Sequence, residues 1–132
     1  MKARNYECHQ GCPVEATLDL IGGRWKGVIL FNLIGGPVRF NELRRRMPDV
    51  SQRVMTRQLR ELEAADIVSR TLTPTVPPRV DYALTEHGAT LAPVIQAMRD
   101  WGHVYLDAKK AAGAQPVAPA KAERFAEAAR AR

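Results

Sequence analysis

The chain has 132 residues, of which 20 are lysine or arginine and 14 are aspartate or glutamate, so its formal net charge is +6. This length allows one domain with a modest core. The apolar runs are far shorter than the ~20 residues that span a bilayer, and the start MKARNYECHQGC lacks the apolar stretch of a signal peptide. We therefore expect a cytoplasmic protein with no membrane segment, whose two cysteines are reduced.

The first two predicted helices are short and apolar. Pro13 suits the first turn of a helix, and this helix has Val14, Leu18 and Ile21 on one face. A Gly-Gly turn ends it. A second helix is predicted over residues 24–34, and it is apolar nearly all round, which is typical of a central, buried helix.

The stretch from Phe40 to Leu84 has the element order of a winged helix-turn-helix: a basic helix, a tight turn, a second helix and a β-hairpin. The basic helix, FNELRRRM, ends at the turn formed by residues 48–50. Ser51 is expected to cap the second helix, SQRVMTRQLRELEAA, because its hydroxyl can accept from an amide of the first turn. One face of this helix carries apolar residues at helical spacing: Met55, Leu59 and Leu62.

The opposite face of the second helix is basic. Guanidinium groups suit both phosphate oxygens and the guanine edge, although exposed arginines on an isolated helix are usually just a solvated face. Here residues 39–60 hold seven basic and two acidic side chains, whereas residues 61–108 hold three and seven. Because the positive charge is concentrated on this helix and its neighbour, we predict that it contacts duplex DNA. The predicted contacts are Ser51, Gln52, Arg53, Thr56, Arg57 and Arg60.

Period-two alternation follows and predicts a β-hairpin. Its strands contain Ile67, Val68, Arg70 and Leu72, then Val80, Tyr82 and Leu84, with the proline-stiffened turn TPTVPP between them. Arg79 lies where the turn meets the returning strand. There it can reach a phosphate or the minor groove, or remain solvated.

A last long helix is predicted from Thr85 to about Lys110, bent at Pro93 because proline lacks the amide that a helix interior uses. Its apolar stripe is too wide for one small domain to cover, so we expect a second copy to cover it, giving a homodimer on a palindromic operator. The alternative is an ordinary core face that packs on the second helix. The predicted dimer surface comprises Val14, Leu18, Leu91, Ile95, Met98, Trp101 and Tyr105.

These motifs, in this order, resemble the HxlR-type bacterial winged helix-turn-helix regulators, which are relatives of the MarR group. The resemblance covers about residues 12–102 and rests on CPVEATLDLIGGRWKGVILFNLIGGPVRFNEL, SQRVMTRQLRELE and PPRVDYALTEHGATLAPVIQAMRDWG. It implies a mainly α fold with a small β wing, and N- and C-terminal dimerisation helices. One departure is Ala65-Asp66, where the family usually has a glycine ending the recognition helix, and aspartate tolerates a left-handed conformation less well.

We divide the chain into an irregular arm (1–11), one domain (12–110) and an Ala-rich basic tail (111–132). Cys12 lies at the start of the first helix, where backbone amides and the helix dipole favour a thiolate. The resemblance implies that this cysteine senses oxidants or electrophiles, as in several members of the family. The alternative is a small buried hydrophobe. Cys8 either resolves an oxidised Cys12 or is an incidental surface thiol.

The sequence favours a dimeric transcriptional regulator, most simply a repressor, over an enzyme. A thiol enzyme built on Cys12 would need a base and an orienting group, and no such constellation is visible. A winged-helix protein-interaction module is a third possibility, against which the arginine face argues. We expect no cofactor, because phosphate-loop and dinucleotide motifs are absent. We also expect no metal, because Cys8, His9 and Cys12 have no obvious fourth ligand nearby.

Overall fold

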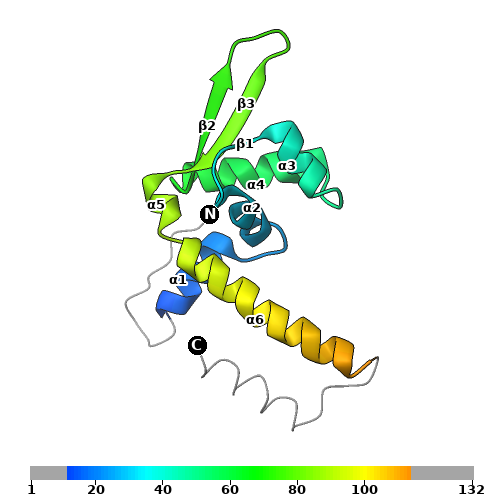
Figure 1. Ribbon diagram of the computed structural model, residues 1–132. Coiled ribbons are helices and arrows are strands. Elements are labelled where there is room, and N and C mark those ends of the chain that lie inside the picture. The colour runs from blue at the N-terminus through cyan, green and yellow to red at the C-terminus, as the bar shows by residue number, and fades with distance from the viewer. Residues whose placement is uncertain (1–11, 114–132) are drawn as a thin grey trace. The chain divides into compact units, whose positions relative to one another are not determined.

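The computed structural model describes residues 12–113, which divide after Ala92 into two compact units. The predicted arm, and the predicted tail beyond Gly113, lie outside the described residues. The elements, in chain order, are α1 (Cys12–Ile21), α2 (Lys26–Leu33), β1 (Val38–Arg39), α3 (Phe40–Arg46), α4 (Gln52–Ala64), β2 (Val68–Thr73), β3 (Arg79–Leu84), α5 (Glu86–Ala89) and α6 (Ala92–Ala111) (Figure 1). The predicted class, mainly α with a small β wing, is confirmed.

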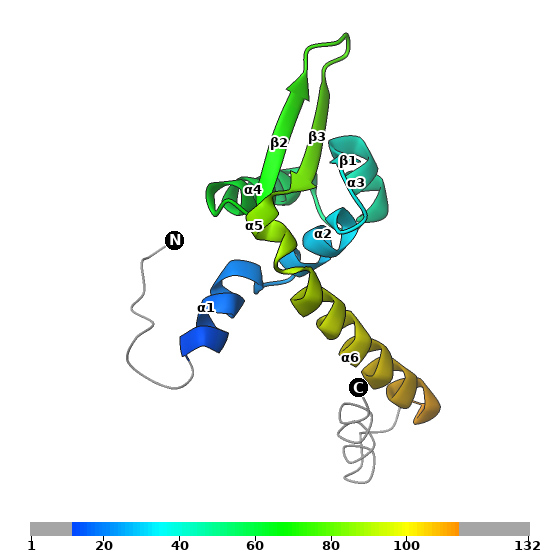
Figure 2. The same cartoon turned by 60° about the vertical axis from the view of Figure 1, so that its left-hand side comes forward.

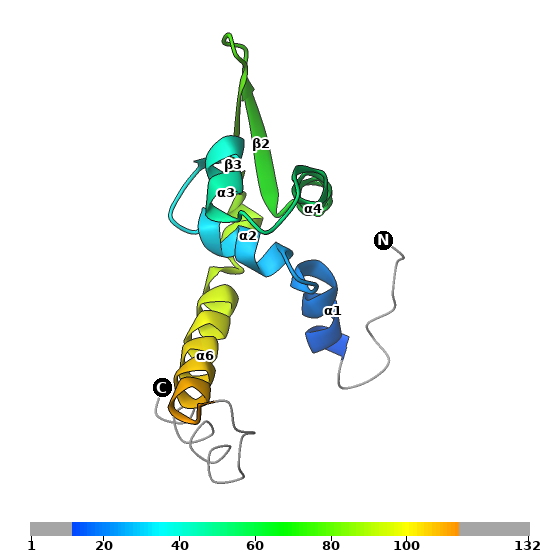
Figure 3. The same ribbon diagram turned by 90° about the vertical axis from the view of Figure 1, so that its right-hand side faces the viewer.

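The three strands form one antiparallel sheet in the order β1-β3-β2. The β2–β3 ladder runs from the Val68–Leu84 pair to the Thr73–Arg79 pair, as the alternation predicts. In each view this hairpin, the wing, extends beyond helices α2 to α4 (Figures 1, 2 and 3). The sequence gives no signal for β1, because two residues are too few for a periodic pattern and the strand exists only by pairing with β3.

The core of the first unit lies where α2, α3 and α4 contact β2 and β3. Each of these elements except β3 contributes side chains that are almost completely buried: Ile29, Leu30, Leu33, Leu43, Met55, Leu59, Leu62 and Val68. Burying each such side chain stabilises the fold by ~1.5–3 kcal/mol. The prediction that α2 is buried nearly all round is wrong for Val28 and Phe31, which are 44% and 43% exposed.

Helix α1 begins at Cys12 and ends near its Gly-Gly turn, where the Gly22 amide donates to the Leu18 carbonyl at 2.6 Å. Of its predicted apolar face, Ile21 is buried. By contrast Val14 and Leu18 are 65% and 57% exposed. The folded first unit therefore leaves most of this face uncovered.

The prediction of one helix from Thr85 to Lys110 is wrong. Thr85 does cap a helix, accepting from the Gly88 amide at 2.8 Å, but α5 ends at Ala89 and α6 begins only at Ala92. The break has a local cause, because Pro93 has no amide to donate to the Ala89 carbonyl and its ring would clash there. Pro93 instead occupies the first turn of α6, where a missing amide costs little.

Helix α6 belongs to the second unit and carries most of the predicted dimer stripe. Val94, Met98, Trp101 and Leu106 are 38%, 50%, 54% and 59% exposed, and the Trp101 and Tyr105 rings stack at 5.5 Å. Ile95 differs from the others because it is only 4% exposed within the single chain. The stripe thus contains one buried residue and a row of exposed apolar side chains.

Candidate DNA-binding interface

Helix α4 starts at the predicted cap. The Ser51 hydroxyl accepts from the Val54 amide at 3.2 Å, so one of the unpaired first-turn donors is satisfied. Val50, just before the cap, is buried and anchors the turn that leads from α3. From α3, the Arg44 guanidinium donates to the Gln52 side-chain oxygen at 3.4 Å. These contacts fix where the N-terminal turn of α4 begins.

The end of α4 explains the departure at Ala65-Asp66. Asp66 has φ +60°, so the left-handed residue that follows the helix is an aspartate. Its amide donates to the Glu63 carbonyl and the Ile67 amide to the Leu62 carbonyl, both at 3.0 Å. This pair of bonds, with Leu62 and Ile67 both buried, is a Schellman motif. Aspartate therefore ends the helix in the way that glycine usually does.

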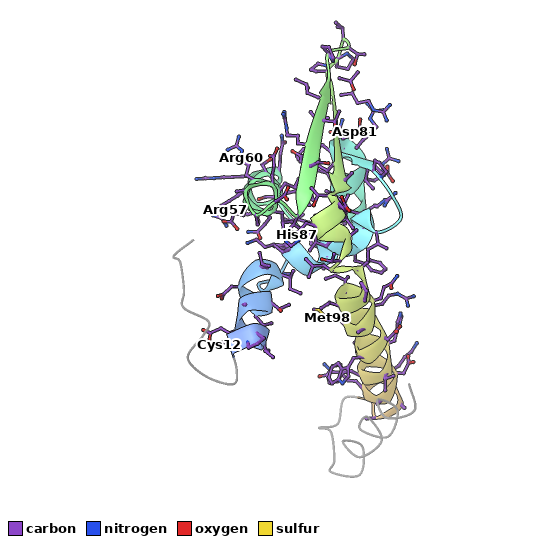
Figure 4. All side chains as sticks on the ribbon, turned by 90° about the vertical axis from the view of Figure 1, so that its left-hand side faces the viewer. Cys12, Arg57, Arg60, Asp81, His87 and Met98 are labelled. Carbon is purple, nitrogen blue, oxygen red and sulfur yellow. The ribbon has the colours of Figure 1, made fainter. Side chains whose placement is uncertain are left out.

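The two faces of α4 separate as predicted. Met55, Leu59 and Leu62 are buried. At about 100° per residue, the positions opposite to them are those of Arg53, Arg57 and Arg60, and all three arginines are exposed. Arg57 and Arg60 project outward from α4 (Figure 4). The arginine row is therefore available to a partner of the first unit.

A salt bridge holds the flank of α4 against α2. The Lys26 ammonium lies 2.7 Å from a Glu61 carboxylate oxygen, and the Lys26 side chain is only 12% exposed. The hydrogen bond from Lys26 holds the pKa of Glu61 below its usual range. Since Glu61 lies beside the arginine row on the same helix, this contact orients α4 without using any of the row.

A groove of about 630 Å³ lies beside the wing and adds to the arginine row. Its lining is drawn from α4, all three strands, the start of α3 and the turn before β3: Arg39, Phe40, Asn41, Thr56, Arg60, Glu63, Arg70, Pro78, Arg79, Val80 and Tyr82. Four of these side chains are arginines, each from a different element, and one is a carboxylate. Such a convergence of guanidinium groups suits a polyanion.

The structure brings Thr56, Arg60 and Arg79 together in this groove. The other predicted contacts lie outside the groove lining, and all four are exposed: the cap residue Ser51, and Gln52, Arg53 and Arg57 of α4. The recognition-helix surface and the groove therefore meet at Arg60.

Sequence reasoning missed Arg39 and Arg70 as candidate contacts. Arg70 lies directly opposite Tyr82 in the β2–β3 ladder, so both side chains are on the same face of the sheet. The alternation of the hairpin sequence indicates this shared face, so Arg70 could have been identified. No local pattern marks Arg39, because its position depends on pairing with β3 across about 40 residues of chain.

Cys12 is the first residue of α1, close to the predicted helix start, and its side chain is a buried thiol. Cys8 and His9 lie outside the described residues. Within residues 12–113 no group of three potential metal ligands comes together. None of the helices in that range is long and apolar enough to cross a membrane.

A family model described as HxlR-like helix-turn-helix matches residues 20–110, well over half of the chain. The chain belongs to the HxlR-like helix-turn-helix family. It is similar to YdeP, an HTH-type transcriptional regulator of Bacillus subtilis (strain 168), with 55% identity over 98 residues that cover 74% of this chain and 77% of YdeP. The chain is thus a transcriptional regulator of the HxlR-like family.

Solved structures of the redox regulator HypR and of the transcriptional regulator YodB are also similar. The redox regulator HypR in its oxidised form is 54% identical, with a TM-score of 0.67 over 70% of this chain and 95% of HypR. Its reduced form is 50% identical, with a TM-score of 0.70 over 75% of this chain and 98% of HypR. Diamide-treated YodB from B. subtilis is 41% identical, with a TM-score of 0.61 over 72% of this chain and 95% of YodB. The HxlR-like chain shares the winged-helix fold of these proteins.

Proposed function

We propose that this regulator binds a palindromic DNA operator as a homodimer, with α4 in the major groove and the wing groove on the adjacent backbone. The observation that carries the proposal is the continuous arginine surface, which runs from Arg53 and Arg57 through Arg60 into the groove with Arg39, Arg70 and Arg79. Guanidinium groups on α4 can read guanine edges, whereas those of the strands are suited to phosphates. Cys12 would make the binding respond to oxidants.

DNA binding is tested by selecting duplexes from a random library and measuring affinity for the selected site over a range of salt. A surface with this many arginines predicts a steep fall of log K with log salt, with a slope of about −0.9 for each phosphate contacted. We expect a palindromic site, with half-sites ~34 Å apart, because two recognition helices of a two-fold dimer read successive major grooves on one side of the duplex. Failure to select any duplex would contradict the proposal.

The homodimer is proposed on a separate observation, the exposed apolar side chains of α1 and α6. Four large apolar side chains are each more than a third exposed: Val14, Leu18, Met98 and Trp101. Soluble monomers rarely expose large apolar patches. Sedimentation at micromolar concentration should give twice the chain mass. A monomer that binds the palindrome tightly would contradict this part of the proposal.

The oxidant response rests on Cys12, which is the first residue of α1. Similarity to HypR, described as a redox regulator, supports it. Because Cys12 is buried and α1 is a proposed dimer element, a disulfide or adduct there would alter the spacing of the recognition helices.

Operator binding with and without diamide is the test of this response. Wild type and Cys8→Ser should respond, and Cys12→Ser should not. Equal insensitivity of all three proteins would assign Cys12 the alternative role of a packed thiol.

A further inference from the structure

One arginine of the wing is held by a carboxylate of its own strand. Arg79 and Asp81 are two residues apart on β3, so their side chains lie on the same face of the strand. The Nε of Arg79 donates to an Asp81 carboxylate oxygen at 2.9 Å. The Arg79 side chain is 48% exposed and the Asp81 side chain 20% exposed, so the anion is the more enclosed partner.

The two residues differ in how firmly the sheet holds them. Asp81 is paired on both sides, with Arg39 of β1 and Thr71 of β2. Arg79 is paired only with Thr73, where the wing is two strands wide and turns. Asp81 is labelled on β3 in Figure 4, beside the body of the first unit. The carboxylate is thus fixed on the part of β3 that is three strands wide, and it holds an arginine on the two-stranded part.

The geometry of the bond leaves the DNA-binding end of Arg79 available. A guanidinium has five N–H donors, and the bond through Nε leaves the four on the terminal nitrogens. An exposed ion pair of this kind adds little to stability. A carboxylate in a surface that binds DNA also repels the DNA phosphates. Neither stability nor charge therefore explains why an acid lies beside this arginine.

We propose that Asp81 is a positioning residue, which holds Arg79 through Nε so that the terminal nitrogens meet a DNA phosphate or the edge of the minor groove. This inference rests on the proposed DNA binding and adds the role of one residue to it. Ordering a long side chain at an interface has a cost, and Asp81 removes part of that cost before DNA arrives.

The sign of the effect of removing Asp81 discriminates this role from simple repulsion. Asp81→Ala should weaken binding to the selected operator about two- to tenfold, the cost of ordering one long side chain, although it removes a negative charge from the interface. Asp81→Asn keeps the shape of the side chain and should have an effect in the same direction. Simple repulsion predicts tighter binding by both variants.

Glu63→Gln is a matched control, because Glu63 is a carboxylate that lines the groove together with Arg79. Among residues 12–113 the Glu63 carboxylate has no ion pair. Its removal should therefore tighten operator binding, because it takes a negative charge out of a surface proposed to bind phosphate. If Glu63→Gln weakens binding as much as Asp81→Ala does, the loss is not specific to the Arg79 contact and the positioning role is wrong.

The second arm repeats Asp81→Ala in chains that carry Arg79→Ala or Arg79→Lys. With Arg79 absent, Asp81 has nothing to position, so its removal should no longer weaken binding. In the Arg79→Lys chain, the lysine has a single side-chain nitrogen, and Asp81 would hold that nitrogen away from DNA. Asp81→Ala in that chain should therefore tighten binding. If Asp81→Ala weakens binding equally in all three chains, Asp81 acts through the fold of the wing and the positioning role is wrong.

A measurement without DNA distinguishes the proposed DNA binding from the positioning role of Asp81. In the NMR spectrum of the wild-type dimer, the Arg79 Nε–H should be more rigid than that of Arg53, and it should become mobile in Asp81→Ala. A rigid Nε–H in a protein that selects no duplex overturns the proposed function together with the role of Asp81. A mobile Nε–H in a protein that binds its operator overturns the role of Asp81 alone.

Discussion

Helices α4 and α6 have similar sequence periodicity but differ in what the folded chain does with it. On α4 the apolar stripe of Met55, Leu59 and Leu62 is buried and the arginines are exposed, so each face has the environment that its composition suits. On α6 only Ile95 and Ala108 are buried, and Met98, Trp101 and Leu106 are at least half exposed. A single chain thus buries the apolar face of α4 but leaves most of the apolar face of α6 exposed.

This difference indicates where each helix finds its partner. The exposed face of α4 is polar and positively charged, which suits a solvated surface or a polyanion. The exposed face of α6 is apolar, and its free energy is lowered by burial against another apolar surface, at about 25 cal/mol per Å². We therefore propose DNA as the partner of α4 and a second copy of the chain as the partner of α6. Variants of each helix can test the two proposals separately.

The largest effect is expected from a charge on α6. Met98 is half exposed in the single chain, so Met98→Glu should leave the monomer folded. In a dimer it would bury an unpaired carboxylate, which costs ~3–5 kcal/mol. Sedimentation should show the dimer dissociating at least about a hundredfold more readily, and affinity for the palindrome should fall with it.

Gln96→Glu is the matched control, because Gln96 lies on the same helix, is exposed and acquires the same charge. It should leave the dimer intact. Ile95 is a poorer site for this experiment, since it is buried within the single chain and a charge there would also unfold it. If the Met98→Glu protein remains fully dimeric, the apolar face of α6 is not the dimer surface.

The next effect concerns the exposed face of α4. Replacing Arg53 or Arg57 with alanine should cost ~1–3 kcal/mol of operator binding if the side chain reads a base. If it holds a phosphate, the salt slope should fall by about one. Arg99→Ala on α6 serves as the control for loss of one positive charge. Undiminished binding by the Arg53, Arg57 double variant would show that α4 is not the recognition helix.

The same two helices show how far sequence alone predicts this molecule. The cap at Ser51, the buried stripe and the arginine row of α4 follow from local residue types and spacing, and all three features are present. The sequence also predicts the hairpin. These features share one property, since each is determined by residues within about two turns or one strand of each other.

What could not be predicted depends on distant residues or on competition between local signals. Strand β1 forms only because β3 pairs with it, so Arg39 could not be placed in the groove beforehand. At the start of α6, apolar periodicity favours a continuous helix, but Pro93 interrupts it between Ala89 and Ala92. The contact between Arg79 and Asp81 could not be predicted, because strand alternation shows only that the two side chains share a face of β3 and not that they form a bond.

A smaller effect is expected at the start of α4. Ser51→Ala removes the oxygen that accepts from the Val54 amide, so the free energy of unfolding should fall by about 1 kcal/mol. Ser51→Asp should largely restore it, since aspartate is an equally good cap. Urea unfolding at fixed protein concentration measures both changes. Equal stability of all three proteins would mean that tertiary packing, and not the cap, fixes where α4 begins.

The smallest effect is expected at the other end of α4, where Asp66 has φ +60°. Glycine adopts this conformation without the steric cost that a Cβ imposes, although it also gains entropy in the unfolded chain. Asp66→Gly should therefore raise the free energy of unfolding by only about 0.5 kcal/mol. The neighbouring Ala65 has φ −83°, which any residue adopts, so Ala65→Gly should lower it by a similar amount. Opposite signs at adjacent positions would show that the backbone conformation sets the end of α4, whereas a loss of stability in Asp66→Gly would mean that the carboxylate itself stabilises this end of the helix.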